Sequence, residues 1–138
     1  MAGEVTAAAA FTAAQVHMRA PFSWGLRRDC TVACVAFSAL HGTDPLGRCD
    51  VTYSTKREAY RIVTRAGGYL AWCRATIELP TTETPGPGDL ALIESCDPLG
   101  AAMALCIKPG EFASKTETGL MISHGIVLEA WTCRSSPL

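Results

Sequence analysis

The sequence lacks an excess of charge of either sign, a long apolar run and a phosphate-binding glycine loop. Its 12 basic and 13 acidic residues give a formal net charge of -1, so no broad electrostatic field for nucleic acid or for an anionic membrane is expected. No uninterrupted apolar stretch approaches the ~20 residues of a membrane span, and no glycine-rich stretch has phosphate-cradling spacing. These absences argue against a nucleic-acid partner, a membrane span and a P-loop site.

Length and composition predict one globular domain made in a reducing compartment. The 138 residues fit a single domain, and 49% of them are hydrophobic. The seven cysteines are odd in number and irregularly spaced, so most thiols are expected to be free. The start of the chain carries Glu4 and lacks a basic leading segment, which is not typical of a secretory signal. We expect residues 1–20 to be an N-terminal segment suited to docking and residues 21–138 to be the domain.

The first half of the chain carries helix signals, and the central helix is the most apolar. The stretch from Cys30 to Leu40 is almost wholly apolar or small, and Asp29 before it is a good N-cap. A further helix opens with the capping-box pattern of Thr55 and Glu58 and stops at two glycines. The sequence therefore predicts three helices, over residues 8–19, 30–40 and 55–66.

The second half of the chain changes to short strand patterns. Turn-rich segments separate apolar runs of four to six residues, as in small antiparallel sheets. The expected strands cover residues 69–74, 90–93, 103–107, 119–122 and 126–131. Because helices come first and strands second, the pattern indicates an α+β domain rather than an alternating parallel one.

Cys30 is expected to open the apolar central helix and is the first candidate for a reactive nucleophile. Unpaired amides and the positive end of a helix stabilise a thiolate there, and Arg27 and Arg28 precede the cysteine. The alternative is that Cys30 is a small buried hydrophobe, as free cysteines usually are. Cys34 follows at i+4, but neither a zinc-ligand pattern nor the two-residue redox spacing accompanies the pair. We therefore expect no metal and no cofactor.

Several short motifs together resemble the NlpC-type cysteine peptidases, which have a papain-like core. More closely, they resemble an uncharacterised relative of that fold encoded among phage tail genes. The resemblance covers residues 21–131. The residues that carry it are Pro21-Phe22-Ser23-Trp24-Gly25, Asp29-Cys30, Gly42-Thr43-Asp44-Pro45, Tyr53 and Gly88-Asp89-Leu90.

The resemblance implies roles for single residues, but the chain departs from the family at the position of the general base. Cys30 matches the family's nucleophile and Asp29 its usual preceding acid, in a supporting role. The histidine that serves the family as general base normally opens the second core strand, where this chain has Ala102. A cysteine peptidase needs a base to hold the thiolate and protonate the leaving amine. His124, one strand later and beside Gly125, is the candidate replacement; the alternative is an exposed turn histidine.

Aromatic residues near the motif are candidates for a binding groove. Trp24 lies closest to Cys30 in the sequence, and Phe22 and Tyr53 belong to the same set of motifs. Such rings supply flat contact area for a sugar or peptide, although they more often fill a core.

Two functions follow from these expectations. The first is a structural or assembly protein of a phage tail tip or baseplate with a degenerate catalytic set. It would be made in the host cytoplasm, carried in the virion, and in contact with other tail proteins such as hub or distal tail components. The second is an active cysteine endopeptidase that cleaves cell-wall peptidoglycan peptides during phage entry, with Cys30 as nucleophile and His124 as base.

Overall fold

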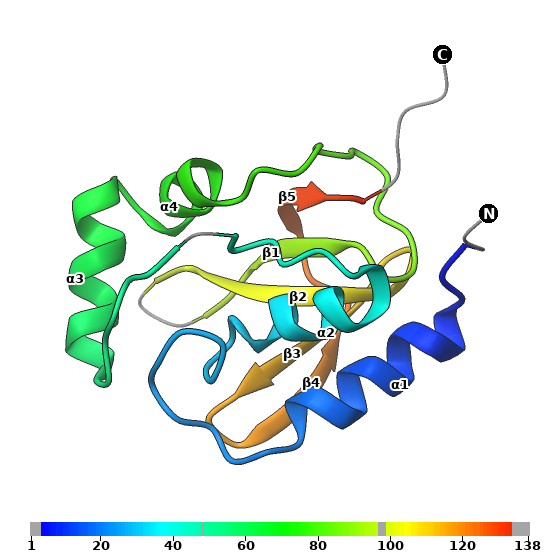
Figure 1. Ribbon diagram of the computed structural model, residues 1–138, viewed down its shortest axis with the longest axis horizontal. Helices are drawn as coiled ribbons and strands as arrows, with labels where there is room; N and C mark the ends of the chain where they lie inside the picture. The colour runs from blue at the N-terminus through cyan, green and yellow to red at the C-terminus, as the bar shows by residue number, and fades with distance from the viewer. Residues whose placement is uncertain (1–3, 48, 97–98, 134–138) are drawn as a thin grey trace.

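The computed structural model describes residues 4–47, 49–96 and 99–133, which form four helices followed by a five-stranded antiparallel sheet (Figure 1). This order confirms the predicted α+β class. The elements are α1 (Ala7–Met18), α2 (Val32–His41), α3 (Lys56–Ala66), α4 (Tyr69–Thr76), β1 (Leu90–Glu94), β2 (Ala101–Lys108), β3 (Glu111–Thr116), β4 (Gly119–Ser123) and β5 (Val127–Trp131).

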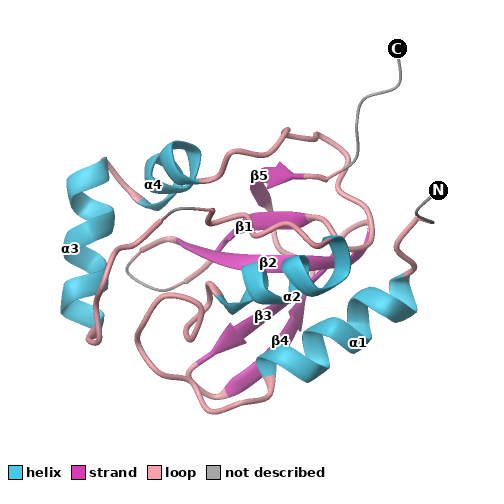
Figure 2. Ribbon diagram, in the orientation of Figure 1, coloured by secondary structure: helices cyan, strands magenta, loops and turns pink. Residues whose placement is uncertain are grey.

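The sheet has the strand order β4-β3-β2-β1-β5, so the chain's last two strands lie at opposite edges. Helices α1 and α2 pack on each other across one face of the sheet, while α3 and α4 stand together at one side (Figure 2). The register of β3 against β4 is regular over five residue pairs. By contrast, the pairing of β1 with β5 shifts between Leu92 and Ile93.

Alternating side chains of β2 contribute to a hydrophobic core on each face of the sheet. Met103 and Leu105 are fully buried in the larger core, which also contains apolar residues of α1 and α2. Ala104 and Cys106 point to the smaller core on the opposite face, where Phe112 is the largest buried side chain. This alternation follows from the two-residue period of a strand.

The structure places the N-terminal helix within the domain. Ala10, Ala14 and Met18 of α1 are fully buried, and α1 packs on α2 and against β2, β3 and β4. Thr6 caps this helix by accepting a hydrogen bond from the N–H of Ala9. The folded unit therefore includes α1 as well as the segment from residue 21 onward.

The predicted capping box of α3 is confirmed. The Thr55 hydroxyl accepts from the N–H of Glu58 at 3.1 Å, and the Glu58 carboxylate accepts from the Thr55 hydroxyl at 3.0 Å. It also accepts from the N–H of Ser54 at 3.1 Å. Gly67 ends the helix in the left-handed conformation, with φ of 101°.

In the second half of the chain, the sequence misassigned one element and missed another. Residues 69–74 lie in helix α4 and not in a strand, because Tyr69, Trp72 and Cys73 bury one side at helical spacing. The carbonyl of Gly68 accepts the hydrogen bond from the N–H of Trp72 that begins this helix. Strand β3 was not predicted, since its buried positions include the polar residues Ser114 and Lys115.

Candidate functional site

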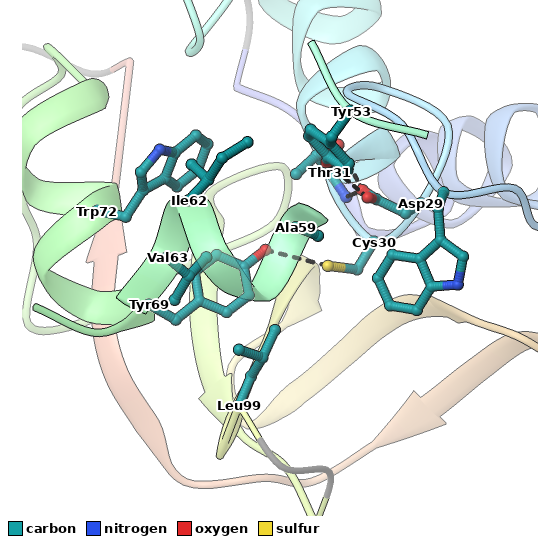
Figure 3. Close-up of a pocket in the computed structure, with 11 residues that line it drawn as sticks. Asp29, Cys30, Thr31, Tyr53, Ala59, Ile62, Val63, Tyr69, Trp72 and Leu99 are labelled. Carbon is teal, nitrogen blue, oxygen red and sulfur yellow. Dashed lines mark hydrogen bonds between the residues drawn. The ribbon is translucent and has the colours of Figure 1, made fainter. Parts of the chain in front are cut away.

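The turn before α2 is organised around the buried carboxylate of Asp29, which is 3% exposed. Its Oδ1 accepts from the Thr31 N–H at 2.9 Å and from the Thr31 hydroxyl at 2.7 Å. Its Oδ2 accepts from the Tyr53 hydroxyl at 2.6 Å and, at 3.5 Å, from the N–H of Gly25 (Figure 3). Four donors therefore hold one carboxylate and fix the turn from two sides of the chain.

The central helix begins at Val32, so the prediction that it starts at Cys30 was wrong. The cause is the Asp29 turn: the carboxylate caps the N–H of Thr31, and Thr31 itself is the N-cap residue. Backbone bonds from Val32 to Asp29 and from Ala33 to Cys30 tighten the chain ahead of the regular helix. Cys30 consequently lies in the tight turn just before the helix.

The side chain of Cys30 points away from the Asp29 carboxylate and toward α4 (Figure 3). Its Sγ lies 3.0 Å from the Tyr69 hydroxyl oxygen, at the first residue of α4. Burial raises the pKa of Tyr69 well above its ordinary value, and the neighbouring Cys30 adds to this shift. Tyr69 therefore stays a neutral phenol near pH 7 and can donate to a cysteine thiolate.

A small cavity of about 30 Å³ adjoins Cys30 and Tyr69. Its apolar walls come mainly from α3, α4 and a loop and include Ala59, Ile62, Val63, Trp72 and Leu99 (Figure 3). The turn before α2 and Tyr53 complete the lining. One water-sized probe needs roughly 10–15 Å³. The cavity therefore has room for a water molecule or a methyl-sized group.

A larger groove of about 440 Å³ shares Cys30 and Tyr69 with the small cavity. Trp24 and Phe22 line the groove and pack edge to face, with ring centroids 5.0 Å apart. Trp24 also contacts Tyr60 at 6.4 Å between ring centroids. The structure thus brings Trp24 and Phe22 to the same groove as Cys30.

Tyr53, which the sequence predicted as a binding residue, does not line the groove. Its hydroxyl donates to Asp29, and its ring lines the small cavity rather than the groove. Burial raises the pKa of Tyr53 above its usual range, and the Asp29 carboxylate raises it further. The geometry makes Tyr53 a support of the Asp29 turn.

His124 and His41 make hydrogen-bond contacts away from the Cys30 thiol. His124 is exposed, and its Nδ1 lies 3.0 Å from the Gly110 carbonyl oxygen. His41 Nε2 lies 2.8 Å from the carbonyl oxygen of Gly88. None of the described residues that line the cavity or the groove is a histidine, whereas Ala102 does line the groove. The role of His124 as a base stays a prediction.

The two arginines before Cys30 are engaged with neighbouring groups. Arg27 Nη2 lies 2.6 Å from Asp44 Oδ2, and Arg28 Nη2 donates to the Trp24 carbonyl at 3.3 Å. The Arg28 contact holds the loop before α2, and the Arg27 contact links that loop to the segment after α2.

Sequence reasoning missed two residues beside this site. Tyr69 was assigned to a strand, so its approach to Cys30 was not expected. Lys115 on β3 is 3% exposed and lines the groove, and its Nζ donates to the Pro21 carbonyl at 3.3 Å. Burial lowers the pKa of Lys115, while Asp29 opposes this change. A single lysine within an unrecognised strand carries no sequence signal for such burial.

Two further sulfur atoms lie within the core next to this region. Cys34 and Cys73 are fully buried, and Cys34 Sγ lies 3.2 Å from Met103 Sδ. Burial raises the pKa of both thiols, so they stay protonated near neutral pH. Across the described residues, no group of three or more His, Cys, Asp or Glu side chains is arranged to hold a metal ion.

Fold and site together define an α+β protein with a cysteine in a tight turn at the wall of a groove. The model of one protein family, described as Domain of unknown function (DUF6950), matches residues 5–133, and the chain belongs to this family. Comparisons with curated proteins and with solved structures gave no match. None of the helices in the described ranges has both the length and the apolar character to cross a bilayer.

Proposed function

We propose that this protein is a structural or assembly component of a phage tail tip or baseplate, with an NlpC-like fold that does not hydrolyse peptides. The main support for the absence of peptide hydrolysis is the 3.0 Å contact between Cys30 Sγ and the Tyr69 hydroxyl. The motifs around Trp24, Cys30 and Gly88 support the assignment to a phage tail. In this proposal the protein is made in the host cytoplasm and contacts hub or distal tail proteins in the virion.

A phenol is poorly suited to replace the general base of a cysteine peptidase. The base must accept the thiol proton and later protonate the leaving amine. Because burial raises the pKa of Tyr69, its hydroxyl keeps its proton near neutral pH and cannot accept the thiol proton. The Asp29 carboxylate is occupied by Tyr53 and Thr31, and the Lys115 ammonium by the Pro21 carbonyl. These contacts favour a retained fold with a changed site.

The second candidate function is a cysteine endopeptidase that acts on cell-wall peptides. It is favoured by the position of Cys30, half-buried at the wall of a groove that also presents Phe22 and Trp24. A groove of about 440 Å³ lies within the range of small-ligand sites. This function requires a base such as His124 to reach the thiol.

Incubation with purified peptidoglycan separates the two candidates. Mass spectrometry would follow the release of peptides by the wild type, by Cys30→Ala and by the matched control Cys49→Ala, which removes a half-buried thiol outside the groove. We expect no release by any of the three proteins. Release by the wild type and Cys49→Ala that is lost in Cys30→Ala would overturn the non-hydrolytic proposal.

The tail assignment has its own test. Quantitative mass spectrometry of purified phage particles should find the chain at a constant ratio to the tail proteins, in the wild type and in Cys30→Ala. A chain that is abundant in the lysate but missing from purified particles would contradict a role in the virion.

A further inference from the structure

The two edges of the sheet differ in how their outer backbone groups are covered. At the β5 edge, the segment 80–82 runs alongside and makes an isolated bridge between Thr81 and Trp131. The N–H of Thr82 donates to Ala130 O, and the N–H of Thr132 donates to Pro80 O, both at 2.9 Å. At the opposite edge, β4 is paired with β3 on one side and no other described strand pairs with it.

Strand β4 lacks several of the features that usually protect a sheet edge. Its sequence, Gly-Leu-Met-Ile-Ser, has no charged residue and no proline, and its pairing with β3 has no bulge. Met121 is 49% exposed and Ile122 is 38% exposed. An open, apolar edge of this kind is a template for pairing with another strand.

The loop length indicates which backbone groups of β4 face outward. Residues 117 and 118 form a two-residue hairpin loop, so the flanking pair Thr116–Gly119 exchanges hydrogen bonds within the hairpin. By alternation, Met121 also bonds toward β3, whereas the N–H and C=O groups of Leu120 and Ile122 point to the open edge. Two residues thus present four backbone groups to a partner strand.

We propose that β4 pairs antiparallel with β4 of a second copy of this chain, about a twofold axis at Met121. In this register Leu120 lies opposite Ile122 of the second copy, and the outward groups of both residues are satisfied. Met121 lies opposite itself in a non-hydrogen-bonded pair, where the side chains are closest.

The second copy is the chosen partner because the strand is complementary to itself. A twofold pairing places each residue opposite a defined partner, and across β4 these pairs contain no charges that would repel.

This inference goes beyond the proposed function and does not depend on it. It uses the backbone of β4 and the side chain of Met121, which also lines the groove, but not the Cys30 thiol or the Tyr69 phenol. A failure of strand pairing would leave the peptidoglycan result unchanged, and peptide hydrolysis by Cys30 would leave the strand pairing unchanged.

Disulfide formation across the proposed axis is the first test. Antiparallel non-hydrogen-bonded pairs have Cα atoms about 4.5 Å apart, which a disulfide can bridge since it spans about 4.4–6.8 Å. We would introduce Met121→Cys into a background with Cys96→Ser and Cys133→Ser, which removes two exposed thiols. Mild oxidation followed by non-reducing electrophoresis and intact mass measurement would detect a covalent dimer, and reduction should reverse it.

The matched control is Thr118→Cys, an exposed site that the register places six positions from its own copy. Six strand positions correspond to roughly 20 Å, too far for a disulfide. We expect the Met121→Cys protein to form the dimer at least about tenfold faster, because pairing raises the effective concentration of its two thiols. Equal rates for the two variants would overturn the proposal.

Sedimentation equilibrium tests the same interface without new thiols. The wild type should show a dimer whose share rises with concentration up to about 1 mM, where contacts of about 4 kcal/mol are populated. Met121→Lys places like charges opposite each other and should remain monomeric, whereas Val16→Lys, at an exposed apolar site on α1, should behave as the wild type. If Met121→Lys does not fold, Ile122→Lys replaces it. A monomeric wild type throughout this range would contradict the proposal.

Discussion

Asp29 and Cys30 are neighbours in the chain, yet their side chains lie in opposite kinds of surroundings. The Asp29 carboxylate is buried and accepts hydrogen bonds from Gly25, Thr31 and Tyr53. Cys30 is half-buried, its Sγ lies 3.0 Å from the Tyr69 hydroxyl oxygen, and it lines both the small cavity and the groove. One peptide bond therefore separates a polar network from a thiol at a groove.

This difference assigns separate tasks to the two residues. Buried donors that lose their acceptor each cost about 1–3 kcal/mol, so the Asp29 network is sensitive to any deletion. A half-buried thiol contributes less to stability than a buried carboxylate that accepts several hydrogen bonds. We expect substitutions on the Asp29 side to change the free energy of unfolding, and substitutions on the Cys30 side to change reactivity.

The largest effect is expected for Asp29→Ala. Loss of the carboxylate leaves the Tyr53 hydroxyl and the Thr31 donors buried without their acceptor, at a cost of roughly 3–5 kcal/mol in the free energy of unfolding. Urea denaturation followed by circular dichroism would measure the loss. Asp50→Ala, at an exposed aspartate, is the matched control and should stay within about 0.5 kcal/mol of the wild type. A loss below about 1 kcal/mol in Asp29→Ala would remove the distinction between the two regions.

Tyr53→Phe removes one donor and keeps the ring. Because this hydroxyl bonds to a buried carboxylate at 2.6 Å, we expect a loss of about 1–2 kcal/mol in urea denaturation. Tyr60→Phe is the matched control, since its ring packs against Trp24 and its hydroxyl has no hydrogen bond to any described residue. Equal losses in the two variants would show that ring packing, not the Asp29 contact, sets the effect.

Raising the pH tests the buried thiols of the apolar core. Burial raises the pKa of Cys34 and Cys73, so these thiols keep their protons in the folded protein while the unfolded chain ionises. Stability is therefore lost as the pH rises above the unfolded thiol pKa of about 8.5. Urea midpoints at successive pH values should fall above this point, and less steeply in Cys34→Ala than in Cys96→Ala, which replaces an exposed thiol. Identical pH profiles for the two variants would contradict this account.

The parts of the fold that the sequence predicts are those in which local and tertiary preferences agree. The capping box at Thr55 and Glu58 involves residues three positions apart, so the sequence contains the whole interaction. Strands β1, β2, β4 and β5 are apolar runs between turns, and each was expected within one or two residues of its observed bounds. Residues 69–74 were misassigned because a short apolar run fits a buried helix as well as a strand.

The site was predictable only where its residues are close in sequence. Asp29, Cys30 and Trp24 lie within seven residues, and their motif predicted a helix start at Cys30, two residues before the observed start at Val32. Tyr69 and Lys115 reach the same region from 39 and 94 residues away from Cys30 and Pro21, respectively. Their approach depends on how α4 and β3 pack, and no local pattern records that packing.

The smallest effect on stability is expected for Tyr69→Phe, whose main readout is the reactivity of Cys30. A neutral phenol that donates to the thiolate stabilises it, and one hydrogen bond is worth about 1 kcal/mol net, or roughly fivefold in rate. Alkylation at Cys30, resolved from the other thiols by peptide mass spectrometry, should therefore slow by about three- to tenfold at neutral pH.

His124→Ala is the matched comparison for that measurement. The His124 imidazole is exposed and lies against Gly110, so its removal should leave the alkylation rate of Cys30 unchanged within about twofold. The opposite pattern, with His124→Ala slow and Tyr69→Phe unchanged, would mean that the imidazole reaches the thiol in solution. In that case Cys30 would have the partner that a peptidase requires, and its contact with Tyr69 would be a resting arrangement of an active site.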